Sequence, residues 1–416
     1  MASGTRELFK SSTIISVGVA LARLLGFGFS LVLARLLSPD DYGFIQYTLT
    51  LAGLVTMLTL PFGQHVLARY IGNVKDKPAE LDEFLGTAWI ILIGLVAVTL
   101  LIAIPALWFA GRLSLGLIVV FLGFTLHYSY FGLARGFMAS WRLMAAYLGS
   151  NVVQMVVIVI VYVFMGERSP MPALIIYGAS YLLPIALLQF SQPFPVRFRL
   201  FVPDRAYVRR ILKFSAPIWI SHAAYTFYAG VDILLIERFL GTGAVGMYAL
   251  TKTLTMLLSF VPTGLTTVLL PRVAAGPDES HHVLLRNTIL ITLATNALVL
   301  IFLLVVYRPF ITFVFGEAYV VPLAVLVMLS LSEIGFGIHG IITAVVVGAG
   351  QPQLETISRV VVVVISVIFG VVFIPRLGLV GGALTTLAGA VAAILTYVFA
   401  SYWLKRDITH AVIEVR

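Results

Sequence analysis

Ionisable side chains inside long apolar stretches are the residues through which this sequence can do chemistry. Arg23 lies twelve residues before Arg35, about 18 Å along a helix, near the middle of a stretch long enough to cross a bilayer. A charge at that depth costs about 2.5–3.5 kcal/mol on insertion scales, so it usually faces a cavity or a partner. No acidic residue lies in the first six predicted spans. We therefore interpret Arg23 as lining a cavity rather than capping the carbonyls of a broken helix.

Three more charges lie in apolar stretches of the second half. Asp232 and Lys252 lie nine and eleven residues on either side of Gly241, so we expect them at similar depth on two adjacent helices. A structural ion pair and a functional site are both open interpretations of this pair. Glu333 is central in a later stretch, where it is either a proton or sodium site or a partner for Arg23.

Arg35 and Arg238 are predicted to lie on the outer side of the membrane, where positive charge is unusual. Snorkelling to lipid phosphate explains either arginine alone. The two arginines occupy equivalent positions of an internal repeat, so we also predict a paired role at the outer mouth of a central cavity.

The composition indicates a helical membrane protein with many spans. Of 416 residues, 60% are apolar and 11% are charged, and the mean hydropathy is +1.05. Apolar runs of about 20 residues, each enough to cross a bilayer, recur throughout the chain. We predict twelve spans, at 11–36, 43–62, 84–109, 114–134, 143–165, 172–190, 212–237, 244–270, 287–307, 321–347, 356–375 and 379–404.

The connections between spans argue against an enzyme. None is long enough for a folded catalytic domain, and the sequence has neither a glycine-rich phosphate loop nor an HExxH pattern. The chain has no cysteine, and its seven histidines are scattered, with one pair at His281 and His282. We therefore expect no disulfide, no metal site and no cofactor.

The distribution of basic residues predicts the orientation. The two termini and the even-numbered connections hold nineteen Lys and Arg residues, against six in the odd-numbered connections. This bias predicts a multi-pass protein of the cell membrane with both termini cytoplasmic. We attribute the net charge of +9 to this topology rather than to binding of nucleic acid.

The chain contains two copies of one pattern, offset by 203 residues. The anchors Lys10, Arg35, Gly43 and Arg69 fall on Lys213, Arg238, Gly246 and Arg272. Six spans in each half make the copies parallel repeats, an arrangement that some transporters use to build a central site. The predicted organisation is a first bundle at 1–196, a basic linker at 197–211, a second bundle at 212–404 and a cytoplasmic tail at 405–416.

Several segments resemble a known family. The stretch Leu33–Gly43, LARLLSPDDYG, resembles the first-loop signature of the polysaccharide biosynthesis flippases, which carry O-antigen and related lipid-linked oligosaccharides. The stretch Leu212–Pro217 resembles its second-half counterpart. The resemblance implies a V-shaped fold of two six-helix bundles, as in the multidrug and toxic-compound extrusion transporters. The stretch Ala22–Phe27 is similar to an arginine motif of the lipid II flippases, but this chain lacks their further helix pair.

The resemblance implies a flippase that moves a polyprenyl-phosphate- or pyrophosphate-linked oligosaccharide to the outer leaflet by alternating access. In that function Arg23 and Lys252 would neutralise phosphate, and Arg35 and Arg238 would guard the outer mouth. A proton or sodium gradient would contribute through Asp232 or Glu333. The alternatives are a cation-coupled exporter of small molecules with the same fold and, less favoured by the short loops, a membrane glycosyltransferase or polymerase.

Overall fold

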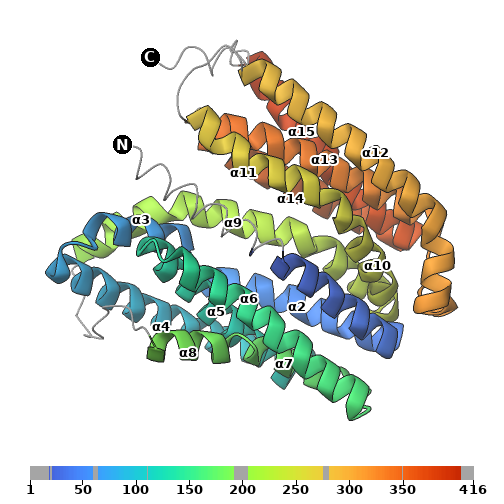
Figure 1. The fold of residues 1–416 in the computed structure, drawn as a ribbon, viewed down its shortest axis with the longest axis horizontal. Coiled ribbons are helices and arrows are strands. Elements are labelled where there is room, and N and C mark those ends of the chain that lie inside the picture. The colour runs from blue at the N-terminus through green and yellow to red at the C-terminus, as the bar shows by residue number, and fades with distance from the viewer. Residues whose placement is uncertain are drawn as a thin grey trace. The chain divides into compact units, whose positions relative to one another are not determined.

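The protein was studied as a computed structural model, which describes residues 18, 21–59, 64–109, 111–191, 205–274, 281–348 and 350–403. Nearly all of these residues are helical (Figure 1). Residues 21–36 form the first described helix. The helices that follow up to residue 191 are α2 (Pro39–Thr59), α3 (Gln64–Val74), α4 (Pro78–Phe109), α5 (Leu115–Gly136), α6 (Ser140–Ile158) with its π-helical continuation η1 (Val159–Phe164), α7 (Pro170–Ala179) and α8 (Leu182–Ser191).

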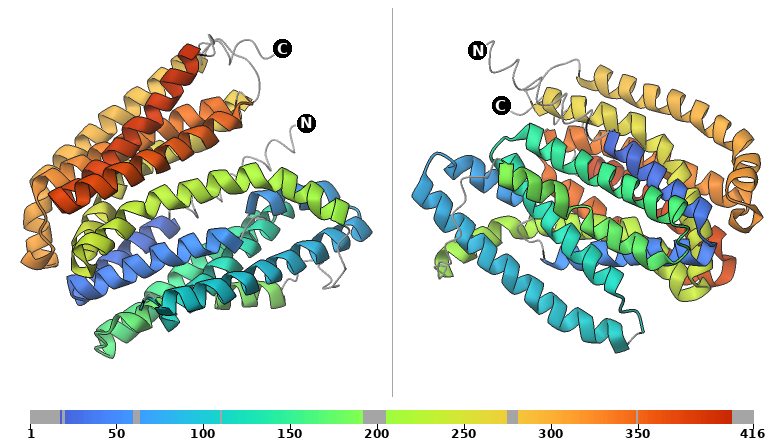
Figure 2. Two further views of the ribbon diagram at one scale, coloured as in Figure 1. Left: turned by 180° about the vertical axis from the view of Figure 1, so that it is seen from behind. Right: turned by 60° about the horizontal axis from the view of Figure 1, so that its bottom comes forward.

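The second half of the chain is also built from long helices. They are α9 (Arg205–Leu240), α10 (Thr242–Thr255), the short 3₁₀ turn η2 (Met256–Ser259), α11 (Phe260–Ala274), α12 (His281–Val314), the 3₁₀ turn η3 (Glu317–Tyr319), α13 (Leu323–Gly348), α14 (Pro352–Leu377) and α15 (Leu379–Trp403). Figures 1 and 2 show α11 to α15 lying beside one another, and α13 and α15 are in contact.

The helices confirm the prediction of a helical membrane protein. In the described part of the chain, nine helical segments are long and apolar enough to cross a membrane. They coincide with the third to sixth and the eighth to twelfth predicted spans. The other three predicted spans fall on helical residues as well, in 21–36, α2 and α9. The full count of twelve spans stays a prediction.

The internal contacts divide the chain into two compact units. Unit 1 comprises Met1–Val32 and Thr48–Thr226, and unit 2 comprises Leu33–Tyr47 and Phe227–Arg416. Residues 33–47 therefore pack within unit 2, although they come from the first half of the sequence. The predicted bundle boundaries at 196 and 212 stay a prediction.

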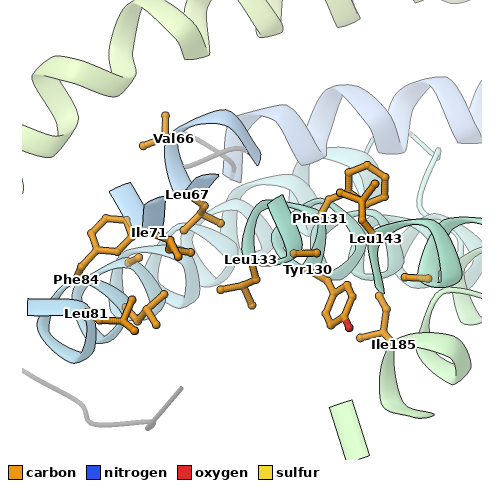
Figure 3. Packing of buried hydrophobic residues seen from close by; sticks show 14 of the residues in the cluster. Val66, Leu67, Ile71, Leu81, Phe84, Tyr130, Phe131, Leu133, Leu143 and Ile185 are labelled. Carbon is orange, nitrogen blue, oxygen red and sulfur yellow. The ribbon is translucent and has the colours of Figure 1, made fainter. Parts of the chain in front are cut away.

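A hydrophobic core of unit 1 joins α3, α4, α5 and α6. Figure 3 shows Leu67 and Ile71 of α3 beside Phe84 of α4, with Leu133 of α5 and Leu143 of α6 in the same cluster. These side chains are at most 7% exposed, so the cluster excludes water and lipid alike. Burial of this kind is the main stabilising contribution that a helix bundle can obtain from packing.

The repeat predicted from the sequence appears in unit 2 as a contact between its two equivalent glycines. Gly43 and Gly246 lie so close that a Cβ at Gly43 would be 1.8 Å from the carbonyl oxygen of Thr242. Likewise, a Cβ at Gly246 would be 2.0 Å from the carbonyl oxygen of Pro39. The backbones of these helices touch directly, and only glycine permits that approach. The same contact therefore uses corresponding residues of both copies.

The helix starts on both sides of this contact follow from local sequence. Ser38 caps α2, because its hydroxyl accepts a hydrogen bond from the backbone N–H of Asp41 at 3.2 Å. Pro39 occupies the first helical position, and the acidic side chains of Asp40 and Asp41 suit the positive end of the helix. The hydroxyl of Thr242, at the start of α10, donates a hydrogen bond to Asp40 at 3.2 Å.

We expect Gly43→Ala to destabilise the protein by at least about 1–3 kcal/mol, because the added methyl group has no room against backbone atoms. Thermal melting of the purified protein in detergent would measure this loss. The matched control is Gly72→Ala in α3, where a Cβ meets nothing within 4 Å. An unchanged melting temperature for Gly43→Ala would show that the helices do not approach as closely as described.

Candidate functional site

A buried charge network lies in unit 2 where α9, α10 and α15 meet. Asp232 is 1% exposed, and its Oδ2 lies 2.6 Å from Nζ of Lys252. The hydroxyl of Tyr248 donates to the same carboxylate at 2.9 Å, and the hydroxyl of Thr386 donates at 3.1 Å. Lys252 also donates to the carbonyl oxygen of Ala229 at 2.9 Å. The carboxylate of Asp232 therefore accepts from three side chains, those of Lys252, Tyr248 and Thr386.

The ion pair that the sequence offered as one of two interpretations is therefore present. The side chain of Lys252 remains 20% exposed, whereas that of Asp232 is 2% exposed. Of the two side chains in the ion pair, only that of Lys252 is thus partly exposed. The positive charge of Lys252 is already neutralised by Asp232, which weakens it as a ligand for a further anion.

Glu333 of α13 is a second carboxylate in this part of unit 2. It lies within electrostatic range of both Lys252 and Asp232. Among the described residues, Glu333 forms no hydrogen bond and no ion pair. A single ammonium group, that of Lys252, therefore lies near two carboxylates. The three groups together carry a net negative charge when all of them are ionised. Pairing of Glu333 with Arg23 stays a prediction.

Arg23 differs from Lys252 in its surroundings. It is exposed on the helix formed by residues 21–36, and within the described part of the chain it has no acidic partner. Its guanidinium lies within electrostatic range of Tyr147 on α6. Within the described part of unit 1, no acidic side chain pairs with the positive charge of Arg23.

Arg35 and Arg238 are both exposed residues of unit 2, each near the end of a helix. This position is compatible with either snorkelling or contact with a charged group. Their paired role stays a prediction. No three His, Asp or Glu side chains of the described residues lie close enough to hold a metal ion; the side chains of His281 and His282 lie outside the described part.

Reasoning from the sequence missed an aromatic cluster in unit 1. Its seven rings, from α5, α6, α7 and the turn before α8, belong to Phe124, His127, Tyr128, Phe131, Tyr147, Tyr177 and Tyr181. Contacting ring centroids lie between 4.5 and 6.2 Å apart. The spacing of Phe124, His127, Tyr128 and Phe131 places these four rings on one face of α5, and that was the signal available in the sequence.

In the loop after η1, outside the predicted spans, the carboxylate of Glu167 is fixed by hydrogen bonds from the backbone. Glu167 accepts hydrogen bonds from the backbone N–H groups of Ser169 and Arg168, which hold the pKa of its carboxyl below its usual range. Tyr162 fixes the same loop, because its hydroxyl donates to the carbonyl of Ser169 at 2.5 Å and accepts from the N–H of Ala173 at 3.0 Å. This loop is a structural element with no surplus charge.

A protein-family comparison places most of the chain within one family model. The model described as polysaccharide biosynthesis protein matches residues 8–276. The probable low-salt glycan biosynthesis flippase Agl15 of Haloferax volcanii is 25% identical over 188 residues, which cover 44% of this chain and 40% of that protein. The chain spans less than half the length of the curated relatives that it matches.

Solved structures share the fold. The lipid II flippase MurJ in an inward closed conformation superposes with a TM-score of 0.71 at 15% identity, covering 96% of this chain and 90% of that one. An inward-facing multidrug resistance transporter of the MATE family gives a TM-score of 0.67 at 17% identity, covering 95% and 96%. The fold is therefore that of this group of transporters, as the sequence predicted.

Proposed function

Because the chain belongs to the polysaccharide biosynthesis protein family, we propose that it is a flippase for an oligosaccharide linked to a polyprenyl phosphate or pyrophosphate. Sugars and phosphates cannot cross hydrocarbon unaided, whereas a polyprenyl tail can remain within it. The protein therefore has to shield only the head group. The glycan flippase among its relatives supports the same substrate class.

The observation that carries this proposal is the unbalanced charge of Arg23. A cation at bilayer depth is costly, and in the described residues no acidic side chain offsets it. A guanidinium binds phosphate through two parallel hydrogen bonds, so the anionic head group of the lipid would supply the missing charge. We assign Arg23 the central role in phosphate binding.

The other charged residues have supporting roles in this proposal. Lys252 would contact the head group only by sharing its charge between the substrate and Asp232. Arg35 and Arg238 would attract the anion at the outer side. Glu333, which has a nearby cation but no hydrogen bond in the described structure, is the candidate for coupling to a proton or sodium gradient.

The membrane potential favours this direction of transport. With both termini cytoplasmic and a negative cell interior, an anionic head group gains about 2.3 kcal/mol per charge per 100 mV on moving outward. Alternating access of the site to the two leaflets would complete the cycle. The substrate then needs no chemical change, in keeping with a transporter rather than an enzyme.

The two carboxylates around Lys252 favour a second candidate, a cation-coupled exporter of small molecules. The two candidates differ in the phenotype of a strain in which the gene is deleted. A flippase predicts loss of the surface glycan and unchanged sensitivity to cationic drugs. Normal surface glycan together with raised drug sensitivity would replace the first candidate by the second.

A further inference from the structure

We infer that the aromatic cluster of unit 1 recognises the saccharide part of the transported head group, while Arg23 holds the phosphate. This inference rests on the proposed function and adds to it the surface that distinguishes a glycan-bearing lipid from the bare carrier. It names sugar hydroxyls and sugar C–H faces as the chemistry that the cluster binds.

The first observation is the number of hydroxyl groups in the cluster. Tyr128, Tyr147 and Tyr177 are half-buried and Tyr181 is buried, and their phenol groups lie within electrostatic range of one another. Neither Tyr128 nor Tyr147 uses its hydroxyl in a hydrogen bond to another described residue. Phenylalanine would fill the same volume without the desolvation cost of a hydroxyl. The hydroxyls of Tyr177 and Tyr181 hydrogen-bond to each other, whereas a cluster that served packing alone would not need the hydroxyls of Tyr128 and Tyr147.

The second observation is a buried polar atom without a partner. His127 is 6% exposed and lies at the centre of the cluster, 4.5 Å from the ring of Tyr181 and 4.8 Å from that of Phe131. In the described structure, Nδ1 of His127 has no hydrogen-bond partner. Leaving such an atom unsatisfied destabilises the folded state. A ligand hydroxyl can remove this cost because it both donates and accepts.

The chemistry of the cluster matches a sugar more closely than a drug cation or a lipid tail. A saccharide has hydroxyls around its edge and C–H groups on its faces, so it uses phenol oxygens and aromatic faces together. A lipid tail would leave the phenol and imidazole groups unsatisfied. A drug cation would favour an acidic partner, and none of the seven described rings of the cluster carries a carboxylate.

The position of Arg23 links this surface to the phosphate. Arg23 lies within electrostatic range of Tyr147, and Phe29 on the same helix packs on Tyr177 with ring centroids 5.5 Å apart. The helix formed by residues 21–36 therefore contains Arg23, the residue proposed to bind phosphate, and also contacts the cluster. In a lipid-linked glycan the first sugar is bonded directly to phosphate, so the two groups require neighbouring sites.

Binding to the purified full-length protein tests the inference with two probes. One is a polyprenyl pyrophosphate carrying a fluorescent disaccharide, and the other is the same labelled carrier without the sugar. We expect the wild type to bind the first at least about tenfold more tightly, since the sugar hydroxyls form hydrogen bonds that the bare carrier lacks. In the triple variant Tyr128→Phe, Tyr147→Phe and Tyr177→Phe, the ratio should fall to within about twofold of one.

Two control variants separate this inference from the proposed function. Tyr70→Phe removes a hydroxyl from unit 1 outside the cluster, where the ring stacks on Phe84, and should leave the ratio unchanged. Arg23→Gln should weaken both probes by the same factor and keep the ratio. A triple variant that keeps the wild-type ratio, or a wild type that binds both probes equally, overturns the inference alone. A wild type that binds neither probe overturns the proposed function.

Discussion

Replacing Arg23 with alanine is expected to lower the transport rate of a polyprenyl-linked glycan by about 10- to 150-fold, while the protein still folds and inserts. The variant loses the hydrogen bonds between a charged donor and phosphate, which are worth about 1.5–3 kcal/mol. Folding should persist because Arg23 is exposed and makes no ion pair within the described residues. Transport is measured with the purified variant in vesicles, and folding by its melting temperature.

The control for Arg23 is Arg112→Ala, which removes an exposed positive charge from the connection between α4 and α5 of the same unit. It should transport at the wild-type rate. Arg23→Lys should show an intermediate rate, since an ammonium binds phosphate as a point charge without the paired geometry of a guanidinium. Wild-type transport by Arg23→Ala would contradict the phosphate site.

Replacing Asp232 with asparagine is expected to destabilise the protein by about 3–5 kcal/mol, which is the range measured when one partner of a buried ion pair is removed. The change would leave the ammonium of Lys252 with only the carbonyl of Ala229 and the more distant Glu333 to balance it. It would also remove the charged acceptor for the hydroxyls of Tyr248 and Thr386. Thermal or denaturant unfolding in detergent measures the loss.

The double variant Asp232→Asn with Lys252→Met should recover much of the stability, because it also removes the ammonium group that Asp232→Asn leaves without its ion-pair partner. A comparison is available in the same unit, where Glu355 pairs with Arg359 one helical turn away on α14. Both of these side chains are about one-fifth exposed, whereas the side chain of Asp232 is 2% exposed, so Glu355→Gln should cost less stability than Asp232→Asn. Equal losses for Asp232→Asn and Glu355→Gln would show that the Asp232 pair is not held in a dry environment.

The sequence anticipated those features that depend on local spacing. The depth of Asp232 and Lys252 relative to Gly241 predicted that they could meet, because two adjacent helices joined by a tight turn keep residues at equal depth side by side. The repeat likewise marked Gly43 and Gly246 as equivalent, and the structure shows them in contact. In both cases the positions of the two residues along their helices restrict which residues can come into contact.

The features that the sequence did not reveal depend on contacts between distant helices. The aromatic cluster draws Tyr147 from α6 and Tyr177 from α7 onto the face of α5, and no periodicity in a single sequence reports which helices pack together. For the same reason, the packing of residues 33–47 within unit 2 was not foreseen. A hydropathy scale gives similar values for all apolar spans. Which helices pack against one another depends instead on the shapes of their side-chain surfaces.

The measurement that tests the central claim most directly is a flipping assay with the purified protein in lipid vesicles. A labelled polyprenyl-pyrophosphate disaccharide is placed in the inner leaflet, and its appearance outside is followed with a membrane-impermeant quencher. We predict that vesicles with wild-type protein expose the disaccharide, that vesicles with Arg23→Ala expose it about 10- to 150-fold more slowly, and that protein-free vesicles do not expose it. Wild-type vesicles that retain the disaccharide inside, yet expel a small cationic dye, would contradict the account.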